Sequence, residues 1–558
     1  MPNAPALLDP RGEPVPAEMI QYIRSRAQGG GMKALQSGGA DMAFPYEASA
    51  LTSVEMSEWL PVVRSPDSEI NPYRDRMVGR VRDLVRNDSW AAGAIESLLD
   101  STIGAKLVMV SEPDWQWLAW KYGKGFDHVW ADEFGERWEA IWRDYSENLG
   151  HYGDVSQQLT VGQQLRLAWR HKLVDGEPLM LRYWLPEYVG RGAADYATAH
   201  LVVDPDRLSN PYQMLDTKHL RGGVEINDNG VPLAYHIREA HQYDWYNALE
   251  ANTWERVERR DDDGFRRVIH DYEHYRAGQN RGVSIFVPVL ARLKMLANYY
   301  GVELQAANIA SSLGLFITSP FDQQMVEQAL LSNDDGRLST YQDFRDVFHE
   351  RRRIMFNKAR IPILAPGEKV ETVSVTRPNS EFSPFTHEML RSVAALTGQS
   401  SEQVHKDYSE ASWSSARAGI NDAEKMYLRR TEEFSIGVAT PMAAGVMHEA
   451  MDRGEFDDVL PRRAPEFLDA ARAYVNCTWL GTGRGWPDPV AERQGAVLGL
   501  DAGFSTLKYE CARQGLDYRK VIAQRTREVR MFKAAGLPRA EWMGQDPASK
   551  AAEKPQAA

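Results

Sequence analysis

The sequence predicts an α+β fold in which helical stretches flank a block of antiparallel strands. Three observations support this class. Apolar residues recur at helical spacing through much of the stretch between residues 71 and 172. Strand-like runs then flank two turn sequences, Asn227-Asp228-Asn229-Gly230 and Asp261-Asp262-Asp263-Gly264, which are typical of hairpins. Finally, apolar positions at helical spacing predict one long amphipathic helix over residues 286–311.

Length and composition indicate a large folded protein with an acidic surface. The chain has 558 residues, of which 43% are apolar, with 16 Trp and 23 Tyr. Lys and Arg total 65 against 78 Asp and Glu, a net charge of -13. A protein that grips nucleic acid tightly is usually basic, so the charge argues against a repressor or nuclease surface. An acidic surface suits a protein past which DNA slides, although charge alone favours ordinary solubility.

The chain shows no export or membrane signal and no disulfide framework. Its N-terminus lacks a basic region followed by an apolar stretch, and no apolar run approaches about 18 residues. Cys477 and Cys511 stand far apart without partner spacing, so we expect two small buried apolar residues. These features predict a protein made in a reducing cytoplasm with no membrane partner.

The N-terminal third is predicted as an arm followed by helices. Residues 1–68 are rich in Pro, Gly, Ala and Ser and predict a flexible arm. The first helix opens at Asn71 and ends at Gly104, and an interruption near Asp88-Ser89 makes two shorter helices equally well supported. Six tryptophans between residues 115 and 144 could stack on bases. Because they fall at helical spacing without an interleaved basic patch, we favour core packing.

The middle of the chain predicts a strand block and then a rod. A helix over Thr160–Lys172 leads into strands near residues 178–185 and 200–204 and into the two hairpins. The acidic triplet Asp261–Asp263 resembles half of a calcium loop but lacks its glycine and distal glutamate, so a turn is favoured. Ser284 then caps the long helix, which at 1.5 Å per residue spans about 39 Å and needs a surface to lie against.

Beyond the rod, the sequence alternates short strands with helices. Strands are expected at Leu315–Thr318 and Val370–Val375, with a helix at Tyr341–Asn357 between them and a second capped helix from Ser383. Residues 399–415 are polar and predict a loop, with Lys406 as the single cation. The next helix, 416–450, carries Gly437, Pro441 and Gly445, which should kink it. A last helical region covers 488–515 and 518–535.

Motifs of the common enzyme classes are missing from the sequence. There is no Gly-rich loop ending in Gly-Lys-Ser or Gly-Lys-Thr, and no nucleophile elbow. His387-Glu388 and His448-Glu449 lack a second histidine at metal-binding spacing. We therefore expect no catalytic residue, no metal, no cofactor and no enzymatic activity.

The order of these features resembles the phage portal proteins, most closely the lambda-type group. The resemblance rests on RG.S.F.PVL at Arg281–Leu290, LAPGE at Leu364–Glu368 and HKDYSEASWSSARAGI at His405–Ile420, and it spans roughly residues 71–537. It implies a portal fold with an antiparallel β-rich wing, long stem helices, a small α/β clip and a helical crown.

The resemblance also implies a division of the chain into nine segments. These are a flexible arm (1–68), the wing (69–285), stem helix 1 (286–311), the clip (312–380), stem helix 2 (381–398), a tunnel loop (399–415), a long kinked wing helix (416–455), a helical crown region (456–540) and a disordered tail (541–558).

The function that the resemblance implies is a ring, usually of twelve copies, at one capsid vertex of the virion. The ring would be the channel through which terminase packages double-stranded DNA, the route of ejection and the head-tail attachment platform. Implied partners are the terminase large subunit, the major capsid protein and head-tail connector proteins, met first in the host cytoplasm during assembly.

The implied site residues fall into two groups. Lys406, Ser409, Ser412, Trp413 and Arg417 would lie at the DNA channel, and Arg351, Arg352 and Arg353 would face terminase on the clip. The arginine triplet also fits a solvated helix face, which the residues alone favour. The alternative function is a nucleic-acid- or cell-wall-acting phage enzyme that uses the Trp-rich segment as its substrate platform.

Overall fold

The computed structural model describes residues 58–190, 194–312, 354–356, 359–361, 382–409, 412–481 and 489–537. Residues 65–558 form one compact unit, and the segment that ends at Arg64 is a separate one. No helix in the described ranges is both long and apolar enough to cross a bilayer.

The first part of the larger unit is helical. Its helices are α2 (Pro66–Ile70), α3 (Arg74–Asn87), α4 (Ser89–Thr102), α5 (Trp115–Tyr122), α6 (His128–Ser146) and α7 (Val161–Val174). Asp88 separates α3 from α4 and caps the latter, because its Oδ1 accepts the Ala91 N–H at 2.8 Å. The predicted interruption therefore divides two helices. The predicted arm extends too far, since residues 66–68 belong to α2 and Asp67 is buried.

The tryptophan-rich stretch supplies core side chains. Trp130, Trp138 and Trp142 of α6 are buried, and the Trp130 ring lies 5.1 Å from that of Phe134. This confirms core packing for these residues. Trp120 is the exception, because 80% of its surface is exposed.

Two antiparallel sheets follow the helices. The first has the order β3-β2-β8 and the second the order β4-β5-β6-β7. Their strands are β2 (Leu179–Trp184), β3 (Thr198–Val203), β4 (Leu220–Arg221), β5 (Val224–Ile226), β6 (Pro232–Arg238), β7 (Trp254–Glu258) and β8 (Val268–His270). Single 3-10 turns lie at η2 (Pro186–Tyr188), η3 (Pro205–Arg207), η4 (Pro211–Gln213), η5 (Trp245–Asn247) and η6 (Glu250–Asn252).

The second predicted hairpin is only partly correct. The turn at Asp261–Gly264 forms, since the Gly264 N–H donates to the Asp261 carbonyl at 3.0 Å. The flanking strands then separate, because β7 pairs with β6 whereas β8 pairs with β2. This turn carries the chain from one sheet to the other.

The three-stranded sheet lies between the helices and the second sheet. Successive strand residues point to opposite faces, so Leu179 and Leu181 of β2 pack in a strand-lined core. Met180, between them, packs in the large helical core. The sheet thereby joins the two cores of the unit.

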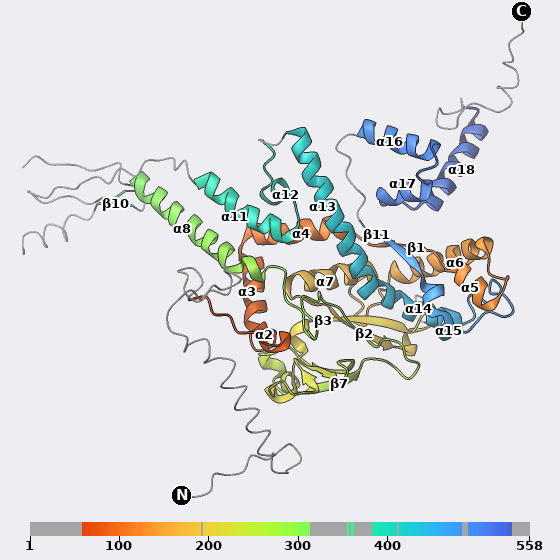
Figure 1. Ribbon diagram of the computed structural model, residues 1–558, viewed down its shortest axis with the longest axis horizontal. Helices are drawn as coiled ribbons and strands as arrows, with labels where there is room; N and C mark the ends of the chain where they lie inside the picture. The colour runs from red at the N-terminus through yellow and green to blue at the C-terminus, as the bar shows by residue number, and fades with distance from the viewer. Residues whose placement is uncertain are drawn as a thin grey trace, which may run out of the picture. The chain divides into compact units, whose positions relative to one another are not determined.

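A 3-10 turn, η7 (Val287–Val289), leads into the rod, α8 (Leu290–Ser312). The regular helix starts at Leu290 rather than at Phe286. Helix α11 (Phe382–Thr397) lies alongside α8 and is followed by the short α12 (Ser401–His405) (Figure 1). Residues 399–415 are therefore not all loop, because they hold α12 and the first turn of α13.

The predicted clip is described only at one small hairpin. β9 (Ile354–Phe356) pairs antiparallel with β10 (Ala359–Ile361). The predicted helix Tyr341–Asn357 is wrong at this end, where Ile354-Met355-Phe356 is an apolar run with high strand propensity. The remainder of that helix, the strands at 315–318 and 370–375, and LAPGE lie outside the described residues.

Helix α13 (Trp413–Phe434) continues through η8 (Ser435–Ala439) into α14 (Thr440–Asp452), and η8 is π-helical (Figure 1). The regular helix is thus interrupted at Gly437, one of the predicted kink positions, and Pro441 follows just after the π-helical segment, where its ring removes one backbone donor from the continuous helix. Gly445 lies within the regular helix. An added Cβ there would come within 2.9 Å of Arg182 Cδ, so this glycine serves packing.

The C-terminal part adds one strand to its helices. Its elements are α15 (Phe467–Val475), β11 (Cys477–Leu480), α16 (Pro489–Asp501), α17 (Leu507–Arg513) and α18 (Tyr518–Ala535). β11 pairs with β1 (Val108–Ser111), a strand that the sequence analysis missed. Tyr474 also stacks on Phe134, so part of the segment 456–540 packs in the helical core. Cys477 is half-buried and Cys511 is buried, and both are free.

Candidate functional site

The start of α8 is anchored by a buried charge network around Glu177. This glutamate is fully buried between α7 and β2 and pairs with Arg281 at 2.6 Å and Arg74 at 2.8 Å. Its Oε2 accepts the Gly282 N–H at 2.6 Å and lies 3.0 Å from His270 Nε2. Burial raises the pKa of Glu177, but the two guanidinium groups outweigh burial and hold the pKa well below its usual range.

Arg281 connects this network to the strand block. Besides Glu177, it donates to the carbonyls of Pro205 at 3.0 Å and Leu208 at 2.7 Å. Gly282 follows in close contact with the loop after α7, where an added Cβ would lie 2.2 Å from the Gly176 carbonyl oxygen. No other residue fits there without a shift of the backbone.

The remaining residues of the RG.S.F.PVL motif fix the position of the chain where it enters α8. Ser284 Oγ donates to the Leu173 carbonyl at 2.8 Å and accepts the Phe286 N–H at 3.2 Å. The Phe286 side chain is fully buried in the helical core. The pattern RG.S.F.PVL is therefore the sequence of an anchor that fixes α8 to the rest of the unit.

Helix α8 is covered only in part. Leu293 and Leu296 are buried, as predicted for the apolar face. Further along, Tyr299 and Tyr300 contact Phe382 of α11, with ring centroids 5.6 and 5.0 Å apart.

Exposed apolar side chains follow on the same helix. Leu304 belongs to the predicted apolar face, yet 65% of its surface is exposed. Met295 and Val302 lie together on the roughly opposite face of the helix and are 62% and 63% exposed. The rod is thus apolar on more than one side, and no described residue covers these side chains.

The predicted tunnel loop begins with a structured turn. Ser400 and Gln403 form a capping box that starts α12, and the Tyr427 hydroxyl donates to Gln403 Oε1 at 2.9 Å. The S-x-x-Q spacing is a signal that could have revealed this helix. α12 packs against α4 through the buried Val404.

The exposed part of the loop follows α12. Lys406 ends the helix in the left-handed conformation, with φ 57°, and its side chain is exposed. The Asp407 N–H donates to His405 Nδ1 at 3.1 Å, and the Ser409 N–H donates to Asp407 Oδ1 at 2.9 Å. The bonds from Ser409 lower the pKa of Asp407.

The other predicted channel residues lie where the loop becomes α13. Ser412 is exposed and caps this helix, because its Oγ accepts the Ser415 N–H at 3.2 Å. Trp413 is the first helical residue, and its side chain lies outside the described part. Arg417, one turn further, is half-buried. Arg351, Arg352 and Arg353 also fall outside the described residues.

Sequence reasoning missed a histidine pair beside this loop. The rings of His387 on α11 and His405 on α12 stack with centroids 4.9 Å apart and planes 21° apart. Burial lowers the pKa of His405, and His387 lowers it further. No local pattern could show the pair, because it depends on how α11 packs on α12.

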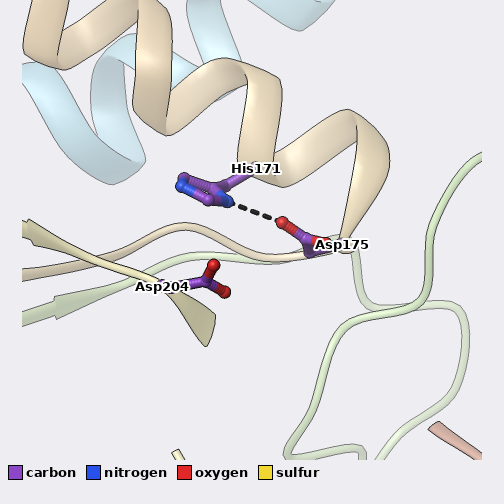
Figure 2. Close-up of side chains that lie close together, drawn as sticks. All are labelled: His171, Asp175 and Asp204. Carbon is purple, nitrogen blue, oxygen red and sulfur yellow. Dashed lines mark hydrogen bonds and ion pairs between the residues drawn. The ribbon is translucent and has the colours of Figure 1, made fainter. Parts of the chain in front are cut away.

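A separate ionisable cluster lies at the end of α7. His171 Nδ1 is 2.6 Å from Asp175 Oδ2, and Asp204 of the following sheet lies opposite them (Figure 2). Arg82 of α3 bonds to Asp175 at 2.7 Å and also pairs with Asp204 and, at 3.4 Å, with Asp206.

Arg82 indicates that this cluster has a structural role. Burial raises the pKa of Asp204, yet Arg82 and His171 outweigh burial and the net pKa is lowered. Burial and the Asp204 carboxylate raise the pKa of the neighbouring Asp206. Although these side chains are of metal-ligating types, the Arg82 guanidinium is the cation that they bind. The cluster therefore joins α3, α7 and β3.

The family model and the related sequences that match this chain agree with one another. A family model described as phage portal protein, lambda family, matches residues 52–431. The portal protein of Escherichia phage N15 and portal protein B of Escherichia phage lambda are each 29% identical over 493 residues, covering 88% of this chain and 90% of theirs. A probable portal protein of Halomonas phage phiHAP-1 is 26% identical over 320 residues, or 57% of each chain.

Solved structures give a weaker likeness. A chain in the virion of a native gene transfer agent particle has a TM-score of 0.39 at 11% identity, with coverage of 79% of this chain and 93% of that chain. A chain in the neck of the native particle, computed with C12 symmetry, has a TM-score of 0.27 at 11% identity, covering 63% and 92%.

Proposed function

Because the chain belongs to the lambda family of phage portal proteins, we propose that twelve copies form a ring at one capsid vertex that conducts double-stranded DNA during packaging and ejection. Members of this family are structural components of the phage particle rather than enzymes. Neither the described residues nor the comparisons support the alternative of a nucleic-acid- or cell-wall-acting phage enzyme.

The observation that carries the ring proposal is the exposed apolar surface of α8. Met295 and Val302 share one face of the rod because they are seven residues apart, Leu304 lies on the roughly opposite face, and each is more than half exposed in the single chain. Large apolar surfaces that remain exposed mark interaction sites. A neighbouring copy, related by a head-to-tail contact that closes into a ring, would cover them on two sides.

The mass of the native particle tests this proposal. We expect light scattering to give about twelve times the 63.1 kDa chain, and the double variant Val302→Glu, Leu304→Glu to shift the mass towards a single chain. Val129→Glu on α6, where 59% of the valine is exposed, is the matched control and should leave the ring intact. A wild-type chain that stays at 63.1 kDa under assembly conditions contradicts the ring.

Within the ring, we place the loop that follows α12 at the channel and the clip at the outer face. Exposure of Lys406, Ser409 and Ser412 supports the first placement. Trp413 and Arg417 join them through the sequence resemblance, which alone supports Arg351, Arg352 and Arg353 as terminase-facing. The major capsid protein and the connector proteins are the other proposed partners, and assembly would begin in the host cytoplasm.

A packaging assay separates these two assignments. Reversing the charge of Lys406 and Arg417 should lower the amount of DNA packaged per active motor without weakening terminase binding. Reversing Arg351, Arg352 and Arg353 should weaken terminase binding itself. Unchanged packaging in the first variant would remove the loop from the channel, and unchanged binding in the second would remove the arginines from the terminase interface.

A further inference from the structure

Helix α18 reverses the sign of charge that characterises this chain. The whole chain has a net charge of -13, whereas α18 holds six basic residues against the single acidic Glu528, a net +5. The basic residues are Arg519, Lys520, Arg525, Arg527, Arg530 and Lys533. No residue of this helix is fully buried, and five of the six basic residues are exposed.

One of the six cations has a structural role. Arg519, at the start of the helix, binds Glu139 at 3.0 Å and Asp132 at 3.1 Å, both on α6. These contacts fix the first turn of α18 to the helical core. Burial opposes ionisation of this guanidinium, but Glu139 and its other neighbours raise the pKa of Arg519 overall.

The second half of the helix carries cations without such partners. The side chains of Arg527, Arg530 and Lys533 are exposed, and among the described residues none of them pairs with a carboxylate. They recur every third residue, so each lies about 4.5 Å further along the helix axis on neighbouring turns. The helix therefore presents a strip of three positive charges that no carboxylate in the described ranges pairs with.

We propose that Arg527, Arg530 and Lys533 form a phosphate-binding strip that contacts the backbone of double-stranded DNA. The inference rests on the proposed function, because a conduit for DNA brings a polyanion to the ring. Solubility does not require an excess of positive charge on one helix, and the rest of the chain carries a net negative charge. The positive strip therefore indicates a negatively charged partner. The strip makes charge contacts and no base contacts, so binding is independent of sequence.

The salt dependence of DNA binding tests the strip. The probe is a fluorescent duplex of arbitrary sequence, titrated with the full-length particle at several salt concentrations. Each phosphate contact contributes about 0.9 to the slope of log affinity against log salt concentration. The triple variant Arg527→Gln, Arg530→Gln, Lys533→Gln should therefore flatten the slope by about 2.7.

Two further variants make the result specific. Arg76→Gln, Arg80→Gln, Arg86→Gln removes three exposed charges from α3 and should leave the slope unchanged. Arg527→Lys with Arg530→Lys keeps the charge and should keep the wild-type slope, because the slope depends on the number of phosphates neutralised. An unchanged slope in the glutamine variant, or an equal loss in the α3 variant, overturns the inference.

The same samples separate this inference from the proposed function. Light scattering reports whether the ring forms, and a missing ring counts against the conduit regardless of the slope. A glutamine variant that loses the ring while its slope stays unchanged would show that the strip binds a neighbouring copy, which also overturns the DNA assignment.

Discussion

Two glutamates in this chain have the same kinds of partner but different surroundings. Glu177 pairs with Arg281, Arg74 and His270 and is fully buried. Glu225 pairs with Arg256 at 2.7 Å and His236 at 3.5 Å, and its side chain is 30% exposed. Removing a buried partner leaves charges that water cannot reach, whereas an exposed pair is screened.

We expect Glu177→Gln to lower the free energy of unfolding by about 3–5 kcal/mol, because it leaves two buried guanidinium groups without an anion. The measurement is guanidinium unfolding followed by tryptophan fluorescence.

Glu225→Gln is the matched control and should cost at most about 1 kcal/mol. Similar losses for the two variants would mean that the Glu177 network does not hold the base of α8. Because that network holds Arg281 and Gly282, which lead into η7 and α8, the Glu177 variant should also weaken ring formation.

At the scale of single residues, the roles that could be predicted from the sequence were those that depend on neighbours in the sequence rather than on distant parts of the chain. The RG.S.F.PVL pattern was visible, but its meaning was not, because Arg281 binds Glu177, Leu208 and Pro205 from other parts of the chain. The candidate channel residue Lys406 could be found as a lone cation in a polar stretch. The stacked pair His387 and His405 could not, since only packing brings them together.

At the scale of single elements, helices with local signals were predicted best. α7 has a capping box at Thr160 and Gln163, and α4 has its cap at Asp88. β11 was missed because its strand state depends on pairing with β1, more than 350 residues earlier in the chain. β9 was missed because a strand of three residues carries too few positions for a periodic pattern.

The π-helical segment η8 depends on a missing side chain. An added Cβ at Gly437 would lie 2.5 Å from Asp271 Oδ1, and Asp271 pairs with Lys172 at 2.6 Å. Gly437→Ala should therefore displace this carboxylate and destabilise the protein by about 1–3 kcal/mol. The shift in the thermal unfolding temperature measures the loss.

Gly79→Ala on α3 should have the opposite sign. It meets no atom within 4 Å, so it should stabilise the helix by up to about 1 kcal/mol through propensity alone. If both variants were stabilising, Asp271 would be free to move and η8 would not depend on the glycine.

At the scale of the whole molecule, the described apolar surface is distributed unevenly. The helical core buries residues from α3 to α15, but the segment from α16 to α18 exposes many large apolar side chains. These are Val490, Val497, Leu498, Phe504, Tyr509, Leu516, Ile522, Val529, Met531 and Leu537. Few buried contacts within a segment mean a low free energy of local opening.

Ring formation should therefore stabilise α16 to α18 more than any other part of the larger unit. We expect amide hydrogens in these helices to exchange at least tenfold more slowly in the ring than in the single chain obtained with Val302→Glu, Leu304→Glu. The physical reason is that a neighbouring copy would cover the exposed apolar side chains and raise the free energy of opening by at least 1.4 kcal/mol, about the value of a tenfold change. Hydrogen exchange followed by mass spectrometry resolves the segments.

The internal control is α4, whose core side chains Ile95, Leu98 and Leu99 are fully buried within one chain. Its exchange should be slow in both states, since its protection does not depend on a neighbour. Equal exchange of α16 to α18 in ring and single chain would show that these helices remain uncovered after assembly. In that case their apolar side chains would be available to a different partner, and the ring contact would be confined to α8 and the elements around it.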